Sequence, residues 1–96
     1  MIFNYNPQRR DDTLTIVKAS DILTINGTAY AFTNLLDGET LPQEAIGCEF
    51  INGDVERTNG ELIIPILLPL KRGASQSAKF PDPATITTDG TVVLPI

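Results

Sequence analysis

The side chains that could carry chemistry in this chain are few, and their spacing fits no catalytic arrangement. There is no histidine or tryptophan, and the only cysteine is Cys48. The lack of histidine excludes a Ser-His-Asp triad, a Cys-His dyad and a His-ligated metal. Ser75 and Ser77 lie in a polar stretch that would hold reacting atoms poorly, and the twelve acidic residues form no recognisable acid–base pair. We therefore predict no catalytic residue and expect a protein that is not an enzyme.

Metal and cofactor sites are not predicted either. The nearest fragments to a calcium loop are Asn52-Gly53-Asp54 and Asp37-Gly38-Glu39, and neither has the alternating acidic spacing of such a loop. Turn formation explains both fragments. The seven glycines are dispersed along the chain, so no glycine-rich phosphate loop is present.

The charge balance and the hydropathy argue against nucleic acid and membrane as partners. The net charge is −5, and the basic residues cluster only as Arg9-Arg10 and Lys71-Arg72. Each pair is too short to follow a phosphate backbone and is typical of a solvated surface. The longest apolar run has nine residues, from Leu62 to Leu70, whereas a membrane-spanning helix needs about 20. The sequence therefore predicts a soluble protein, with Cys48 as a small buried core residue.

Turn signals and β-branched residues predict the fold class. Asn-Gly occurs at 26–27, 52–53 and 59–60, and Asp-Gly occurs at 37–38 and 89–90. These dipeptides accept the positive φ angles of tight hairpin turns. The eleven Ile and eleven Thr residues between them favour strands. We expect one all-β domain over 1–96, a small β-sandwich or β-barrel built of hairpins.

Pairing residues outward from the turns predicts three hairpins. At Asn26-Gly27, Leu23 would face Tyr30, which collects the large side chains on one face. The Asn59-Gly60 turn would place Glu56 opposite Ile63, and the Asp89-Gly90 turn would place Ile86 opposite Val93. Further strands are expected at 2–5, 13–19 and 46–51, loops at 6–12 and 34–44, one helical turn at 42–45, and a flexible loop at about 71–83.

The apolar strand 62–70 is the predicted interaction element. Both of its faces are apolar, and Ile63, Pro65 and Leu67 share the second face. Pro65 lacks a backbone donor and therefore favours an edge position. An edge strand covered by a second subunit would bury Ile63, Pro65 and Leu67, so these residues are the candidate interface of a homo-oligomer. The alternative is a compact barrel whose own loops cover this face.

The overall pattern resembles a family of small uncharacterised proteins of tailed bacteriophages and prophages, encoded among the tail genes. The resemblance runs over nearly the whole chain and rests on the stretches 1–12, 23–27, 37–42, 80–83 and 89–90. This chain departs from the family after Leu67-Leu68-Pro69, where Leu70-Lys71-Arg72-Gly73 replaces a polar, Pro-containing segment. The resemblance implies a virion or assembly role, and it carries over no catalytic residue.

Two functional hypotheses follow. The first is a non-enzymatic structural or assembly protein of a phage or prophage tail. It would act by protein–protein contact with itself or with other phage tail proteins, in the bacterial host cytoplasm during assembly or in the virion. The second is a carbohydrate-binding β-module that contacts a host surface. The absence of tryptophan and the six aromatic residues, mostly on expected strands, disfavour the second.

Overall fold

β-Strands account for most of the regular structure in this computed structural model, which describes residues 1–95. Short runs of β-branched residues bounded by tight turns form these strands, because such side chains pack well on a pleated surface. In chain order the elements are β1 (Ile2–Arg9), β2 (Ile16–Ala19), β3 (Ile22–Ile25), β4 (Thr28–Ala31), β5 (Thr40–Leu41), α1 (Gln43–Ile46), β6 (Val55–Thr58), β7 (Glu61–Leu70), α2 (Gln76–Lys79), β8 (Ala84–Thr85) and β9 (Gly90–Thr91).

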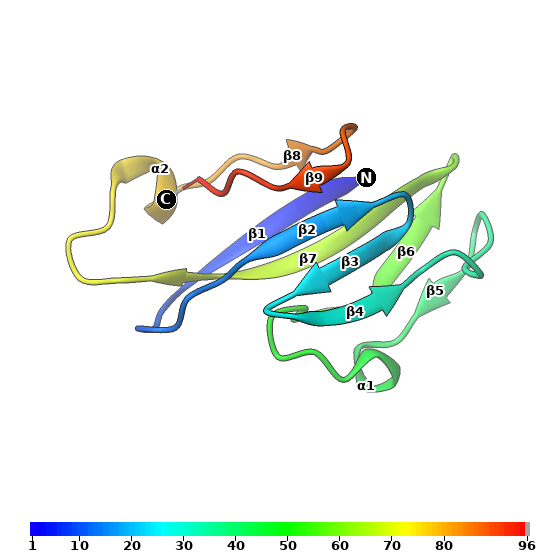
Figure 1. Ribbon diagram of the computed structural model, residues 1–96, viewed down its shortest axis with the longest axis horizontal. Coiled ribbons are helices and arrows are strands. Elements are labelled where there is room, and N and C mark those ends of the chain that lie inside the picture. Colours follow the sequence, from blue (N-terminus) through cyan, green and yellow to red (C-terminus); the bar gives the residue numbers. More distant parts are fainter. Residues whose placement is uncertain (96) are drawn as a thin grey trace.

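The strands form two stacked sheets (Figure 1). The larger sheet has the order β5-β6-β7-β1-β8, and the smaller has the order β4-β3-β2-β9. The sheets do not close into a barrel. The prediction of an all-β domain is therefore confirmed, and the chain adopts the open, two-layer form of that prediction.

Two of the three predicted hairpins have the predicted register. Asn26 and Gly27 take φ angles of 48° and 86°, as a tight hairpin turn requires, and Leu23 pairs with Tyr30. The turn at Asn59-Gly60 likewise places Glu56 opposite Ile63. In both cases the turn residues and the apolar alternation specify the same register.

The longest pairing in the molecule was not predicted. β1 and β7 run parallel over eight residue pairs, from Ile2↔Ile63 to Arg9↔Leu70. β1 therefore extends to Arg9, beyond the expected end at residue 5, and takes in half of the expected loop 6–12. Pro7 is tolerated because the donors of β1 that reach β7 come from even-numbered residues, as Arg10 N–H to Leu70 O at 3.0 Å illustrates. The ring nitrogen of Pro7 faces the other edge, which β8 pairs only at Ile2 and Phe3.

The prediction that the strand 62–70 is an edge strand is wrong. β7 lies in the middle of the five-stranded sheet, between β6 and β1. Pro65 fits there because the segment 51–54, which precedes β6, does not continue the regular β6–β7 pairing opposite it. The pairing with β6 reaches Ile63, and the next contact is the single bridge between Ile51 and Ile66. The missing donor of Pro65 therefore faces a local detour in the chain and interrupts no regular ladder.

The predicted hairpin at Asp89-Gly90 is also wrong. β8 joins β1 in the larger sheet, whereas β9 joins β2 in the smaller sheet. The chain crosses from one layer to the other, so Ile86 and Val93 are not strand partners. The Asp89 carboxylate instead accepts hydrogen bonds from the Ser20 N–H at 3.0 Å and from the Lys18 Nζ at 2.9 Å. These bonds attach the turn to β2.

Two expectations of local structure need correction. The expected strand at 46–51 is absent: α1 ends at Ile46, Gly47 takes a left-handed φ of 71°, and only Ile51 makes a β-bridge. The helical turn expected at 42–45 is present, one residue later. Within the expected loop 71–83, α2 forms because the Ser75 Oγ accepts the N–H of Ala78, which is buried. Whether the rest of 71–83 is flexible stays a prediction.

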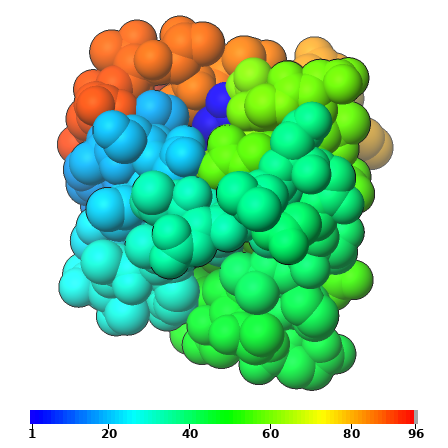
Figure 2. Space-filling model, turned by 90° about the vertical axis from the view of Figure 1, so that its right-hand side faces the viewer, coloured from blue at the N-terminus to red at the C-terminus, as the bar shows by residue number. Residues whose placement is uncertain are grey.

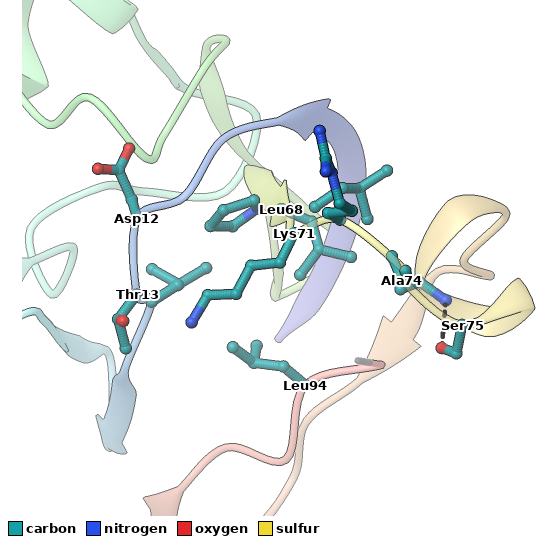
Figure 3. Close-up of a pocket in the computed structure, with 13 residues that line it drawn as sticks. Asp12, Thr13, Leu68, Lys71, Ala74, Ser75 and Leu94 are labelled. Atoms are coloured by element: carbon teal, nitrogen blue, oxygen red, sulfur yellow. Dashed lines mark hydrogen bonds between the residues drawn. The ribbon is translucent and has the colours of Figure 1, made fainter.

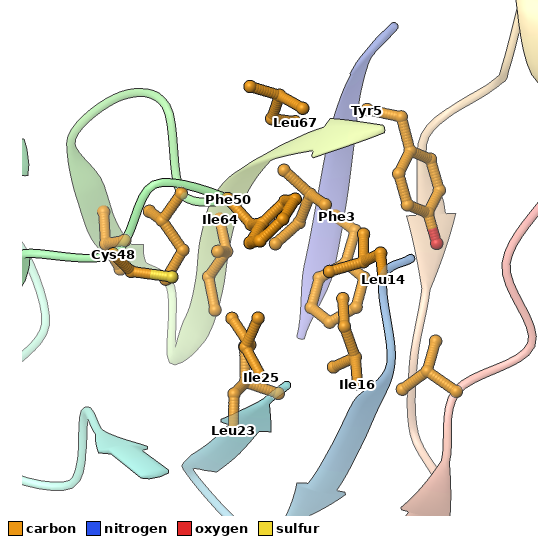
Figure 4. Close-up of a cluster of buried hydrophobic side chains, with 14 of the residues drawn as sticks. Phe3, Tyr5, Leu14, Ile16, Leu23, Ile25, Cys48, Phe50, Ile64 and Leu67 are labelled. Carbon is orange, nitrogen blue, oxygen red and sulfur yellow. The ribbon is translucent and has the colours of Figure 1, made fainter. Parts of the chain in front are cut away.

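The core lies between the two sheets (Figure 4). From the larger sheet, two aromatic residues of β1 and the even-numbered residues of β7 up to residue 68 point inward: Phe3, Tyr5, Leu62, Ile64, Ile66 and Leu68. From the smaller sheet come Ile16, Leu23 and Ile25. Burial of each large apolar side chain contributes about 1.5–3 kcal/mol. The exposed area of 5535 Å² is close to the roughly 5,400 Å² expected for a folded chain of this mass.

Polar side chains close the sandwich at the end where the β2–β3 and β6–β7 turns lie. Arg57 reaches across from β6 and donates to the Leu35 O at 2.6 Å, the Phe32 O at 3.1 Å and the Asp21 Oδ2 at 3.0 Å. The Lys18–Asp89 pair lies nearby, and the Lys18 side chain is 10% exposed. We call these groups the closed end of the molecule.

Candidate functional site

The predicted interface residues do not form one exposed surface. All three lie on the face of β7 opposite to Ile64 and Ile66, and Leu67 still belongs to the buried apolar cluster. Ile63 and Pro65 are half-buried, and Leu67 is only 5% exposed. A Cβ placed on Gly53 would lie 2.9 Å from the Pro65 Cγ, so the 51–54 detour packs on this face. The chain's own loop covers part of the surface, and a role for Ile63, Pro65 and Leu67 in self-association stays a prediction.

A larger candidate site lies at the opposite end of the sandwich from the closed end. It is a groove of about 560 Å³, lined by residues 12–14 and 68–75 together with Ala78 and Leu94 (Figure 3). The groove exists because the two sheets differ in length. β1 and β7 have eight and ten residues, whereas β2 and β3 have four each. The end of β7 therefore extends past the smaller sheet and has no strand opposite it.

The walls of the groove are mostly apolar and come from segments distant in the sequence. Leu68 is fully buried at its base, and Leu14 and Leu94 approach from the segments before β2 and after β9. α2 closes one side through Ala78, which is 1% exposed. Because Ser75 caps α2 and Gly73 takes a φ of 79°, the chain turns sharply after β7 and returns along the groove.

Two basic residues form the rim of the groove. The Lys71 side chain lies across it, with its amino group on the side of Thr13 and Leu94 (Figure 3). Of the seven basic side chains, four have an acidic partner, whereas Lys71, Arg72 and Lys79 have none within the described 95 residues. The carboxylate of Asp12, the one acid in the lining, pairs with Arg10. We call Lys71 and Arg72 the basic rim.

Sequence reasoning assigned Lys71-Arg72 to a solvated surface and placed no site there. The signal available was the position of two adjacent cations directly after the apolar run 62–70. Two cations after an apolar run were not sufficient to predict the groove, because its walls also include Leu14 and Leu94. Neither residue is near the pair in sequence, and only the tertiary fold brings them together.

A second depression, of about 400 Å³, contains the only cysteine. Cys48 is buried, as predicted, and Tyr30 lies beside it. The Cys48 thiol raises the pKa of Tyr30 above its usual value through a side-chain hydrogen bond. A phenol is already protonated at neutral pH, and a raised pKa moves Tyr30 further from the range that suits a general base.

The described residues carry neither a metal-binding cluster nor a membrane-spanning helix. Within residues 1–95, no group of three or more His, Cys, Asp or Glu side chains is placed to hold a metal ion. No helix in the described part of the chain is long and apolar enough to cross a membrane. No protein-family model matches the chain, and comparisons with curated proteins and with solved structures find no match. The groove with its basic rim is therefore the strongest candidate for a functional site.

Proposed function

We propose that this chain is a non-catalytic structural or assembly protein of a phage or prophage tail that acts through protein–protein contacts. The observation that carries the proposal is the groove. It offers apolar walls and two cations that have no acidic partner within residues 1–95. Such a surface suits an apolar side chain with an anionic neighbour, and an exposed apolar depression with a charged rim is typical of a binding surface. The resemblance to phage tail-region proteins supplies the biological context.

The location follows from the same proposal. A tail component is made in the bacterial host cytoplasm and acts there during assembly, or it stays in the finished virion. Its partners would be other copies of the chain or other tail proteins. The net charge of −5 supports a protein partner over a nucleic acid.

Deletion of the gene from the phage or prophage that carries it tests this function. We expect electron micrographs of the resulting particles to show absent or malformed tails, and complementation from a plasmid to restore them. A matched control is complementation with a variant that has a single exposed substitution away from the groove, such as Thr28→Ser. Normal tails and normal infectivity after deletion would contradict the proposal.

Carbohydrate binding is the second candidate, and the aromatic residues give it little support. A sugar platform needs exposed aromatic rings. Of the six aromatic side chains, Phe80 is 72% exposed, Tyr30 is partly exposed, and the other four are buried. A glycan array separates the two proposals, because binding of one glycan class that is lost in Phe80→Ala would favour the carbohydrate module.

A further inference from the structure

The two ends of the long axis differ in the charged side chains that have no ion-pair partner within residues 1–95. The molecule extends 40 Å along this axis. The chain that follows β7, which lines the groove and carries the basic rim, lies near one end (Figure 1). Six acidic side chains make no ion pair within the described residues, and one of them, Asp82, follows α2. The other five lie toward the other end. These side chains are Asp37, Glu39, Glu44, Asp54 and Glu56.

An exposed leucine lies within this acidic region. Leu36 is 65% exposed, and the next two charged residues along the chain are Asp37 and Glu39. We call the turn 36–39 the acidic tip. Figure 2 looks onto this end of the molecule, where the blue-green to green segment that follows β4 lies over the surface. An apolar side chain flanked by two carboxylates is the complement of an apolar groove flanked by two cations.

The acidic tip is held in one conformation. The Leu36 N–H donates to the Glu39 Oε1 at 2.7 Å, and the Glu39 N–H donates to the Leu36 O at 3.0 Å. The Asp37 Oδ1 accepts the Gly60 N–H at 2.8 Å, and the Gly38 N–H donates to the Arg57 O at 2.7 Å. These bonds attach the tip to β6 and to the β6–β7 turn. A preorganised tip loses little conformational entropy when it binds.

We propose that the acidic tip of one copy docks into the groove of a second copy, with Leu36 among the apolar walls and Asp37 and Glu39 beside Lys71 and Arg72. The inference rests on the proposed function, since it names a second copy of the chain as the partner of the same groove. The acidic tip and the groove are complementary in two respects: each has an apolar part, and the carboxylates of the tip match the cations of the basic rim. A volume of about 560 Å³ leaves ample room for one leucine side chain.

This contact differs in kind from a two-fold dimer. Tip and groove lie at opposite ends of the molecule, so each copy presents one of each, and the contact is head to tail. A head-to-tail contact generates a ring if the rotation closes and a filament if it does not. Because each contact pairs carboxylates with cations near the surface, added salt should weaken it.

Two variants with matched controls test the contact by sedimentation velocity over a concentration series. Leu36→Lys removes the apolar tip, and Val93→Lys is its control, because Val93 is 90% exposed and does not line the groove. Lys71→Glu reverses a charge on the rim, and Lys79→Glu makes the same charge change outside the lining. We expect Leu36→Lys and Lys71→Glu each to weaken self-association by about tenfold or more, whereas each control changes it by less than about twofold.

A mixture of the Leu36→Lys and Lys71→Glu variants tests most directly whether the tip of one copy binds the groove of another. Leu36→Lys keeps an intact groove, and Lys71→Glu keeps an intact tip, so mixing them restores one contact per pair. We expect a complex of one copy of each variant that grows no further, at a concentration where each variant alone is a monomer.

Three results would overturn the head-to-tail contact: a wild type that stays monomeric at millimolar concentration, a Leu36→Lys variant that associates normally, or a mixture that stays monomeric. The circular dichroism spectrum of every variant must match that of the wild type, which separates a lost contact from a lost fold. Failure of this test would leave the role in tail assembly to be decided by the gene deletion.

Discussion

The two ends of the sandwich differ in how the gap between the two sheets is covered. At the closed end, polar side chains from both sheets meet, and Arg57 alone donates to two backbone carbonyls and a carboxylate of the opposite layer. At the groove end, β7 extends past the smaller sheet, and residues 12–14, Leu94 and α2 line the space beside it. One end is completed by hydrogen bonds within the chain. The other exposes apolar walls and two cations that have no acidic partner within residues 1–95. This difference is why we propose a binding function there.

The largest effect in this comparison is expected at the closed end. Arg57→Met keeps a long side chain but removes every donor. The Leu35 carbonyl loses the donor that Arg57 supplies, and the Phe32 carbonyl keeps only the Leu35 N–H, in a part-buried region. We expect a loss of about 2–3 kcal/mol in the free energy of unfolding. Urea denaturation measures it as a lower midpoint at an unchanged slope.

Arg72→Met is the matched control at the groove end. Arg72 is exposed and makes no ion pair with residues 1–95, so the change should stay within about 0.5 kcal/mol. Equal losses of unfolding free energy in Arg57→Met and Arg72→Met would show that hydrogen bonds do not stabilise the closed end more than the groove end.

A smaller effect is expected where α2 closes the groove. Ser75→Ala removes the cap that accepts the Ala78 N–H at 3.3 Å, at a cost of about 0.5–1 kcal/mol. Because α2 is a single turn at the molecular surface, we expect the loss to be local. Amide exchange should accelerate at residues 78–80 and stay unchanged in β3. Global acceleration would mean that α2 supports the core.

The smallest effect concerns pH at the closed end. The hydrogen bond from Lys18, followed by the one from the Ser20 N–H, lowers the pKa of Asp89 below its usual value of 3.8. A depressed pKa stabilises the folded state above pH 3.8, and that contribution is lost as the pH falls through the folded-state pKa. Thermal melts should therefore show the stability advantage of wild type over Asp89→Asn shrinking below pH 3.8. A constant difference between the two proteins at lower pH would argue against this pair.

The sequence was informative where a local signal and the apolar alternation agreed. The hairpin at Asn26-Gly27 combines turn residues with a correct sorting of large side chains, and its register was predicted residue by residue. The Asp89-Gly90 turn lacks the second signal. The strands on either side of it, β8 and β9, are short, and they belong to different sheets. A turn dipeptide alone does not determine whether the strands on its two sides pair with each other.

The parallel pairing of β1 with β7 and the groove were beyond prediction for a common physical reason. A parallel pair between distant segments leaves no local signature, because its register depends on the closure of the whole chain. Pro65 was misleading for the same reason, since a proline is tolerated in a central strand when a distant segment detours opposite it. The groove follows from the unequal lengths of β7 and β2, which become visible only once the sheets are assembled.

The most direct test of the docking site is a dilution series of ¹⁵N-labelled wild type followed by amide chemical shifts. We expect one set of signals to shift together with concentration, from the acidic tip at 36–39 and from the groove at Leu14, residues 71–78 and Leu94. Signals from β2 around Lys18, which makes no hydrogen bond to the tip, should stay constant, and added salt should reverse the shifts. Concentration-dependent shifts confined to Ile63, Leu67 and their neighbours, or none at all up to millimolar protein, would contradict the account.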